Sequence, residues 1–249
     1  MFGNFLSEFI KKVYKLSGVK TDFNYPLSEF PETTHSNKYL AFLQGLLTTK
    51  ILIEMSERIV ENPFVFTNLG LKKGTKILEV GCCRSTVALE LSSLGYKVTA
   101  VDLKDYKYIH PNLTFIKGDL RYLNLPINYF DAVTAISTVE HTGIGAYRER
   151  KSMQGDFEIV DVIYNLLKPS GKLLITLPFG KSEVNQHERV YDSKRIRKLL
   201  KKYKIINEEY YKGLGRKYWI PVNKKTLQNV SSVKKGFTQG TICISAQKK

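Results

Sequence analysis

Short apolar runs alternate with helical patterns from residue 75 onward. Runs that predict strands cover 76–80, 97–101, 113–117, 130–136 and 172–177, and apolar positions recur at helical spacing over about 85–94, 156–168 and 193–203. Two later apolar runs, 205–211 and 241–246, are separated by a basic segment. This alternation predicts an α/β fold built on a doubly wound, mostly parallel sheet.

The first 70 residues have a different pattern. Residues 2–16 place their large apolar side chains on one helical stripe with lysines beside it, which predicts an amphipathic helix. A longer helical pattern over 36–61 is expected to end at Pro63. We therefore predict a helical extension or lid over 1–70, followed by a domain over 71–249. The amphipathic helix either covers the core or the substrate pocket, or docks on a membrane surface or a partner.

The composition narrows the class of protein. With 249 residues and 43% hydrophobic content, the chain can bury one substantial core. The sequence contains no run of about 18 apolar residues, so we expect no membrane span. The first residues also lack the continuous apolar region of a secretory signal. Three cysteines provide neither a disulfide framework nor four zinc ligands. We therefore expect a cytoplasmic protein.

Positive charge is concentrated toward the end of the chain. The net charge is +16, of which 181–249 carry +13, because 18 Lys and Arg face five Asp and Glu there. Such a field attracts polyanions or an acidic membrane surface. Solubility is the alternative explanation, so a polyanionic partner is one possibility that the charge leaves open.

The stretch KILEVGCCRS, 76–85, carries the strongest chemical signal. Its apolar run stops at Gly81 and passes directly into a helical pattern, and the next apolar run ends in Asp102, 21 residues after Gly81. A buried strand, a tight turn, a helix and a second strand with a terminal carboxylate form the skeleton of a nucleotide-type pocket. A carboxylate in that place can accept both hydroxyls of a ribose.

This stretch resembles the first motif of the class I S-adenosylmethionine-dependent methyltransferases, although Cys83 and Ser85 stand where the family has its second and third glycines. FDAV at 130–133, followed by the pair Glu140–His141, resembles the small-molecule, ubiquinone-biosynthesis-like branch. The resemblance implies a seven-stranded Rossmann-like sheet, closed by an antiparallel hairpin whose last strand lies between the fifth and sixth strands. The two replacements fit the turn without strain only at negative φ. This departure from the motif leaves two options: the cofactor sits slightly differently, or the loop no longer binds it and the fold serves something else.

The resemblance also implies S-adenosylmethionine as the cofactor. Gly81 would let the backbone approach its methionine end, where the N–H groups of Cys82 and Cys83 at a helix start favour a carboxylate. Asp102 would accept the ribose hydroxyls, and Glu79 would anchor the turn or, through a water molecule, the ammonium group; both could instead simply cap turns. The remaining implied contacts are Leu103, Asp119, Leu120 and Ser137, of which Asp119 would hold the adenine amino group and Leu120 would cover the ring.

Three residues are the candidates for catalysis. His141 would accept a proton from a hydroxyl acceptor, with Glu140 orienting it or binding the substrate. His187, in a segment that also resembles this branch, would stand on the substrate side with Arg189. The alternatives are that Glu140 caps a helix, that His141 packs under the cofactor, and that His187 and Arg189 fix their loop to the domain.

Missing motifs limit the reaction. The fourth strand has no Asn/Asp-Pro-Pro-aromatic group, which argues against transfer to a base amino group or an amide, and no cluster of residues at metal-ligand spacing is present. The first hypothesis is a methyltransferase acting on a small molecule or sugar, at oxygen. The second is a methyltransferase acting on RNA or another polyanion through the basic C-terminal region, and the third is a non-catalytic cofactor-binding or scaffold relative.

Overall fold

The computed structural model describes residues 56–147, 149–214, 218–231 and 238–249. The chain divides into two units, Met1–Leu52 and Ile53–Lys249, and every described residue lies in the second. The predicted amphipathic helix and most of the helical pattern over 36–61 lie outside the described residues. The extension over 1–70 therefore stays a prediction.

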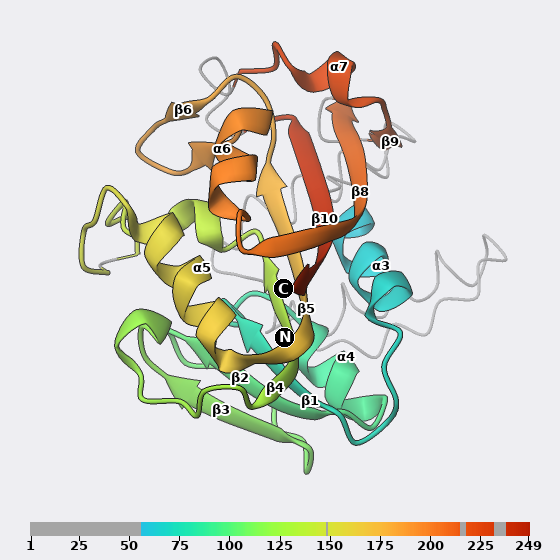
Figure 1. Cartoon of the computed structure of the whole chain (residues 1–249), viewed down its shortest axis with the longest axis vertical. Helices are drawn as coiled ribbons and strands as arrows, with labels where there is room; N and C mark the ends of the chain where they lie inside the picture. Colours follow the sequence, from blue (N-terminus) through green and yellow to red (C-terminus); the bar gives the residue numbers. More distant parts are fainter. Residues whose placement is uncertain (1–55, 148, 215–217, 232–237) are drawn as a thin grey trace, which may run out of the picture. The chain divides into compact units, whose positions relative to one another are not determined.

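Helices and strands alternate along the described part of the chain (Figure 1). The helices are α3 (Arg58–Leu69), α4 (Val87–Ser93), α5 (Gly155–Leu166), α6 (Ser193–Leu199) and α7 (Lys224–Leu227), with 3-10 turns η2 (Leu120–Tyr122) and η3 (Val139–His141). The strands are β1 (Lys76–Val80), β2 (Lys97–Asp102), β3 (Leu113–Lys117), β4 (Phe130–Ile136), β5 (Leu167–Pro178), β6 (Glu183–Val184), β7 (Arg189–Val190), β8 (Tyr203–Leu214), β9 (Tyr218–Pro221) and β10 (Gly240–Lys248).

The central sheet has the strand order β3-β2-β1-β4-β5-β10-β8-β9. Neighbours from β3 to β5 are parallel, whereas β10 pairs antiparallel with both β5 and β8. The predicted fold class is confirmed, and β10 lies where the resemblance implied the last strand. The sheet differs from the predicted seven strands by one, because β8 also pairs with β9, where Leu214 lies opposite Tyr218.

Several predicted boundaries shift because pairing and capping reach beyond the apolar runs. Strand β5 begins at Leu167 rather than 172, since Leu167 already pairs with Phe130 of β4. Helix α6 ends at Leu199 rather than 203, because Tyr203 has joined β8 and pairs with Lys248. Helix α4 begins at Val87, whose N–H donates to the Ser85 hydroxyl. The two shifts at β5 and α6 depend on pairing partners far away in the sequence, whereas the later start of α4 depends on the neighbouring Ser85.

Helix α3 continues through Pro63, so the prediction that the helix ends there is wrong. An interior proline removes one helical hydrogen bond and costs about 3 kcal/mol. The helix is held by the burial of Phe64, Val65 and Leu69 against the sheet, and it ends at Gly70, which adopts the left-handed conformation (φ 53°). Tertiary packing therefore outweighs the local signal.

Apolar side chains cover both faces of the sheet, as its near-continuous apolar strands require. On one face, Val133 and Ile175 belong to the core cluster that contains Ile163 of α5. On the other face, Ala132 belongs to the cluster that contains Leu91 of α4. Figure 1 shows α5 and α6 on one side of the sheet and α3 and α4 on the other. None of the described helices is long and apolar enough to cross a bilayer.

Candidate functional site

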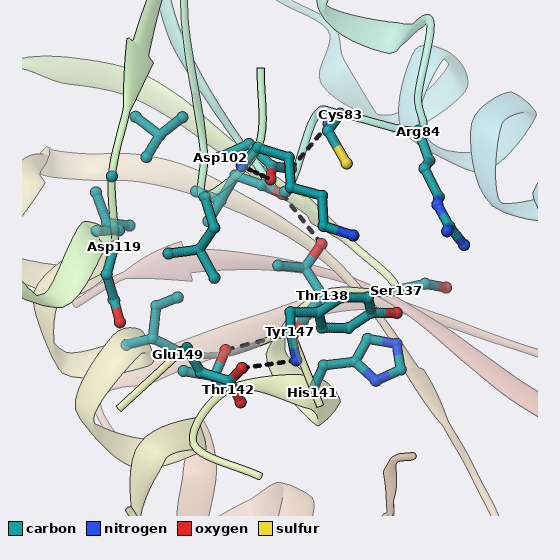
Figure 2. A pocket seen from close by; sticks show the side chains of 18 of the residues that line it. Cys83, Arg84, Asp102, Asp119, Ser137, Thr138, His141, Thr142, Tyr147 and Glu149 are labelled. Carbon is teal, nitrogen blue, oxygen red and sulfur yellow. Dashed lines mark hydrogen bonds between the residues drawn. The ribbon is translucent and has the colours of Figure 1, made fainter. Parts of the chain in front are cut away.

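A cavity of about 450 Å³ opens at the carboxyl ends of β1, β2 and β4, the edge at which open α/β sheets bind ligands. Its size falls within the range of about 300–1,000 Å³ that small-molecule sites occupy. The predicted site residues that line it are Gly81, Cys83, Asp102, Leu103, Asp119, Leu120, Ser137 and His141. Glu79, Cys82, Glu140 and His187 do not line it. Figure 2 shows the lining side chains converging on this space.

The turn after β1 depends on Gly81. Gly81 has a φ of 81°, and a Cβ placed there would overlap the hydroxyl of Thr138 and lie 2.6 Å from its Cγ2. The Thr138 hydroxyl in turn contacts the carbonyl oxygens of Val80 and Ile136, at 3.1 and 2.9 Å. Only glycine therefore permits this close approach of β1 and β4 beside the cavity.

Replacing Gly81 by alanine is expected to destabilise the protein by roughly 3 kcal/mol, from backbone strain plus steric overlap. Gly74 is the matched control, because its φ is 82° but nothing lies within 4 Å of a Cβ placed there. Gly74→Ala should therefore lower the free energy of unfolding only by the backbone strain at positive φ, about 1–2 kcal/mol. Urea unfolding of both variants measures the difference, and equal losses would contradict a packing role for Gly81.

The two missing glycines do not obstruct the turn. Neither Cys83 nor Ser85 is among the described residues with positive φ, so both side chains are accommodated without backbone strain. The Cys83 N–H donates to one oxygen of Asp102, at 2.8 Å, and the Lys104 N–H donates to the other, at 2.9 Å. Because a carboxylate has about four acceptor positions, Asp102 can hold the turn and still accept hydrogen bonds from a ligand.

Glu79 and Cys82 lie behind this turn and are buried. The Thr134 hydroxyl donates to the Glu79 carboxylate, which therefore ties β1 to β4. Burial raises the pKa of Glu79 from 4.5 to about 7. The structure thus places Glu79 where the turn is anchored, and the buried Cys82 does not line the cavity.

Ser137 is supported by residues that the sequence analysis missed. Its φ of 42° is rare for a residue with a side chain. Its hydroxyl donates to Glu61 of α3 at 2.7 Å, and its N–H donates to the Thr176 hydroxyl at 2.9 Å. Burial raises the pKa of Glu61 to about 7, and Arg58, which lines the cavity, lies 3.7 Å from its carboxylate. Helix α3 thus reaches the floor of the cavity.

The raised pKa values of Glu61 and Glu79 predict that stability falls as pH rises from about 4.5 to 7. In the unfolded chain both carboxyls ionise near 4.5, whereas the folded protein keeps them protonated up to about 7. Each neutral carboxyl contributes on the order of 3 kcal/mol to the free energy of unfolding. This contribution is fully present below about pH 4.5 and is lost above about pH 7. Chemical denaturation between pH 4.5 and 8 measures the slope.

The substitutions Glu61→Gln and Glu79→Gln should each flatten that slope. Glu158→Gln is the control, because hydrogen bonding to Ser152 and Arg121 lowers the pKa of Glu158 and moves its titration below this pH window. A slope that both buried variants leave unchanged would contradict the assignment.

His141 is held in one tautomer beside the cavity. Its Nδ1 lies 2.5 Å from the carbonyl oxygen of His187, so Nδ1 carries the proton and Nε2 is left to accept one. Burial lowers the pKa of His141, which keeps the ring neutral near pH 7. A carboxylate oxygen of Glu140 lies 3.7 Å from Nε2, but burial raises the pKa of Glu140 well above its ordinary value. The arrangement can accept a proton at Nε2.

His187 and Arg189 fix the loop instead of lining the cavity. The His187 side chain is exposed, and its backbone carbonyl makes the contact with His141. Arg189 is buried and donates to the carbonyl oxygens of Thr142 at 2.5 Å and Ser152 at 3.0 Å, which clamps both ends of the segment after η3. Of the two interpretations left open for these residues, the geometry favours the structural one, and a direct role for the His187 imidazole finds no support in it.

Asp119 lines the cavity, but its carboxylate already accepts hydrogen bonds from Arg121. Arg121 donates to both oxygens of its carboxylate, through Nε and Nη2, at distances from 2.7 to 3.2 Å. Leu120, the first residue of η2, is buried at the edge of the cavity. A ligand amino group would therefore share Asp119 with Arg121.

Tyr147 and Glu149, on the loop after η3, also line the cavity and were not predicted. The Glu149 carboxylate accepts hydrogen bonds from the N–H groups of Gly145 and Tyr147 and closes the loop on itself. The Tyr147 ring lies 5.3 Å from that of His141, centroid to centroid. The feature of the sequence that indicates a close-fitting turn here is the pair of glycines, Gly143 and Gly145. Both adopt positive φ in the structure.

Comparison with known families identifies the chain. Residues 115–244, which are 130 of its 249 residues, match the model of a family described as "Caenorhabditis protein of unknown function, DUF268". The chain belongs to the DUF268 family. The match covers β3 to β10 and therefore includes His141 and the loop after η3.

Curated relatives match this DUF268 chain over part of its length. It is 28% identical to the sterol 24-C-methyltransferase erg-4 of Neurospora crassa over 120 residues, which are 43% of this chain and 29% of that protein. It is also 28% identical to the S-adenosyl-L-methionine-dependent Diels–Alderase iccD of Talaromyces variabilis over 167 residues, 59% of this chain and 53% of that one. The matched segment of the chain thus spans less than a third of the length of the first relative and about half the length of the second.

Solved structures confirm the fold of the DUF268 chain. The 1,6-didemethyltoxoflavin-N1-methyltransferase of Burkholderia thailandensis, solved with its substrate and S-adenosylhomocysteine, superposes with a TM-score of 0.53. That match covers 93% of this chain and 98% of the other at 15% identity. The fold is therefore the Rossmann-like fold of class I methyltransferases. Within the described ranges, no three His, Cys, Asp or Glu side chains converge as a metal-binding group.

Proposed function

We propose that the chain is an S-adenosylmethionine-dependent methyltransferase that acts on a small-molecule acceptor at oxygen. The observation that carries the proposal is the cavity between the Gly81 turn and Asp102, with the neutral imidazole of His141 on its wall. The nucleoside part of a cofactor and a small acceptor can occupy such a space together. The names of the relatives, which are enzymes dependent on S-adenosylmethionine or methyltransferases of small molecules, support the same class.

The residues present fit this cofactor. The Gly81 turn leaves room for close backbone approach, and Cys83 and Ser85 add no strain to it. Asp102 would hold the ribose, and Asp119 and Leu120 would hold the adenine at the other end of the cavity. When bound, S-adenosylmethionine would supply an electrophilic methyl group, whose transfer depends mainly on the positioning of the acceptor.

His141 would provide the base for a hydroxyl acceptor. Its Nδ1 is held by the His187 carbonyl, so Nε2 would accept the hydroxyl proton as the oxygen is methylated. Tyr147 and Thr138 would close the space around the acceptor and limit the access of water. Arg189, through its hydrogen bonds to the loop, would keep Tyr147 in place.

The basic C-terminal region supports the polyanion hypothesis less well. On α6, Arg195 is engaged by the buried Asp156 at 2.7 Å, and Lys202, just beyond it, pairs with Asp161 at 2.8 Å. Part of the positive charge is therefore used in ion pairs with the domain itself. Binding of RNA that falls steeply with salt would revive this second hypothesis.

Two measurements test the proposal. Calorimetry of the full chain with S-adenosylhomocysteine should give binding, and incubation with methyl-labelled S-adenosylmethionine and a host small-molecule extract should give a labelled product by mass spectrometry. Absence of binding would contradict the proposal. Binding without any labelled product would favour the non-catalytic relative of the third hypothesis.

A further inference from the structure

Two cations at the cavity have no acidic partner among the described residues. Arg84, beside the turn after β1, and Lys104, just after β2, both line the cavity and are exposed. No carboxylate in the described part of the chain pairs with either side chain. By contrast, Arg58, the other guanidinium of the lining, lies beside Glu61. Two unpaired cations facing one space favour an anionic ligand there.

The lining also carries four carboxylates, those of Glu57, Asp102, Asp119 and Glu149. Both oxygens of Asp102 accept backbone hydrogen bonds, and the carboxylate of Glu149 is used by two N–H groups of its own loop. Asp119 is paired with Arg121 and lies on the opposite side of the cavity from Arg84 in Figure 2. Among the described residues, Arg84 and Lys104 are thus the lining cations that no carboxylate holds at ion-pair distance.

Both cations lie close to the same pair of side chains. The Nζ of Lys104 is 5.2 Å from the centroid of the Tyr147 ring, a cation–π distance. Burial raises the pKa of the Cys83 thiol and of the Tyr147 phenol; the charges of Lys104 and Arg84 partly oppose this at Cys83, and that of Arg84 does so at Tyr147, so both cations lie near these side chains. The ring of His141 packs edge-on against Tyr147 from the other side.

We infer that the acceptor is a flat hydroxyl compound that carries an anionic group, a carboxylate or a phosphate. Tyr147 would cover its ring, Lys104 and Arg84 would bind the anion, and His141 would face the hydroxyl. A carboxylate is matched by the planar guanidinium of Arg84, and a phosphate is bound equally well by both cations. This inference rests on the proposed function, because it assigns the acceptor side of the same cavity.

Binding of simple probes to the protein saturated with S-adenosylhomocysteine tests the inference. Benzoate, phenyl phosphate and benzyl alcohol each present one ring, but only the first two carry a negative charge. Calorimetry or ligand-observed NMR should find that at least one anionic probe binds roughly tenfold or more tightly than benzyl alcohol. The better anion distinguishes a carboxylate-bearing acceptor from a phosphate-bearing one.

The variants Lys104→Ala and Arg84→Ala should bring the ratio of anion to alcohol affinity close to one. Lys107→Ala is the matched control, because Nζ of Lys107 lies 5.1 Å over the Tyr108 ring but the residue does not line the cavity. This control should keep the wild-type ratio. Tyr147→Leu should weaken all three probes while the preference for the anion persists.

Three results would overturn the inference while leaving methyl transfer intact. They are equal binding of all three probes, no detectable binding of either anion, and a loss of S-adenosylhomocysteine affinity in the Arg84 and Lys104 variants with the probe ratio unchanged. The last would mean that these cations serve the cofactor. Failure of the wild-type chain to bind S-adenosylhomocysteine would instead overturn the proposed function, and this inference with it.

Discussion

Replacing His141 by glutamine is expected to lower kcat for a hydroxyl acceptor by roughly 10²–10⁴-fold, the usual contribution of a positioned general base. Glutamine keeps polar atoms near the position of the ring but cannot take up the hydroxyl proton. The affinity for S-adenosylhomocysteine should change little, because the cofactor residues on the Gly81 and Asp102 side are untouched. Steady-state kinetics combined with calorimetry separate the two quantities.

The pH dependence of kcat gives a second readout for His141. Burial lowers the pKa of this ring below its ordinary value of 6.5, so the neutral, proton-accepting form persists at lower pH than a free imidazole would allow. Activity should therefore fall on the acid side only below pH 6.5, and the glutamine variant should lose that limb. His110→Gln is the control, because His110 precedes β3 and does not line the cavity. Wild-type kcat in His141→Gln would show that the imidazole only packs in the wall.

Replacing Asp102 by alanine is expected to weaken S-adenosylhomocysteine binding by roughly 10²–10⁴-fold. Each hydrogen bond to a charged acceptor contributes roughly 1.5–3 kcal/mol, and the ribose would lose two of them. The turn would also lose its hold on Cys83 and Lys104, whose N–H groups donate to this carboxylate. Calorimetry on the variant gives the affinity, and its thermal unfolding shows how much of the effect comes from a loosened turn.

Two further variants isolate the ribose contribution of Asp102. Asp102→Asn keeps an acceptor oxygen and should recover part of the affinity. Asp105→Ala removes a nearby carboxylate that pairs with Lys117 on the surface and does not line the cavity, so it should leave binding unchanged. Undiminished affinity in Asp102→Ala would contradict the role assigned to this carboxylate.

The strands and the turn could be predicted because their signals are local. A parallel sheet covered on both faces requires near-continuous apolar strands, so the runs that became β1 to β4 were visible in the chain. Gly81 and Asp102 end two adjacent parallel strands, so the sequence also predicted that they would meet. Pro63 is the counter-example, because its helix-breaking tendency is local while the burial of Phe64 and Val65 that overrides it is not.

Side-chain direction was not predictable from the same patterns. Glu140 and His141 are neighbours in the sequence, yet the ring lines the cavity and the carboxyl is buried away from it. His187 lies beside His141 in space, but its carbonyl makes the contact, whereas its imidazole is exposed. A motif specifies which residues meet, and the backbone conformation of η3 and of the segment before β7 decides which atoms they present.

By itself, the amino-acid sequence determined the α/β class, the positions of the parallel strands along the chain and the Gly81–Asp102 edge, because the pattern and spacing of residues along the chain encode each of them. Only the tertiary structure decided that Glu61 supports Ser137, that Arg189 clamps the loop carrying Tyr147, and that no carboxylate of the described ranges pairs with Arg84 or Lys104. These relations join segments far apart in the chain. They depend on packing between elements, and no local pattern of residues records them.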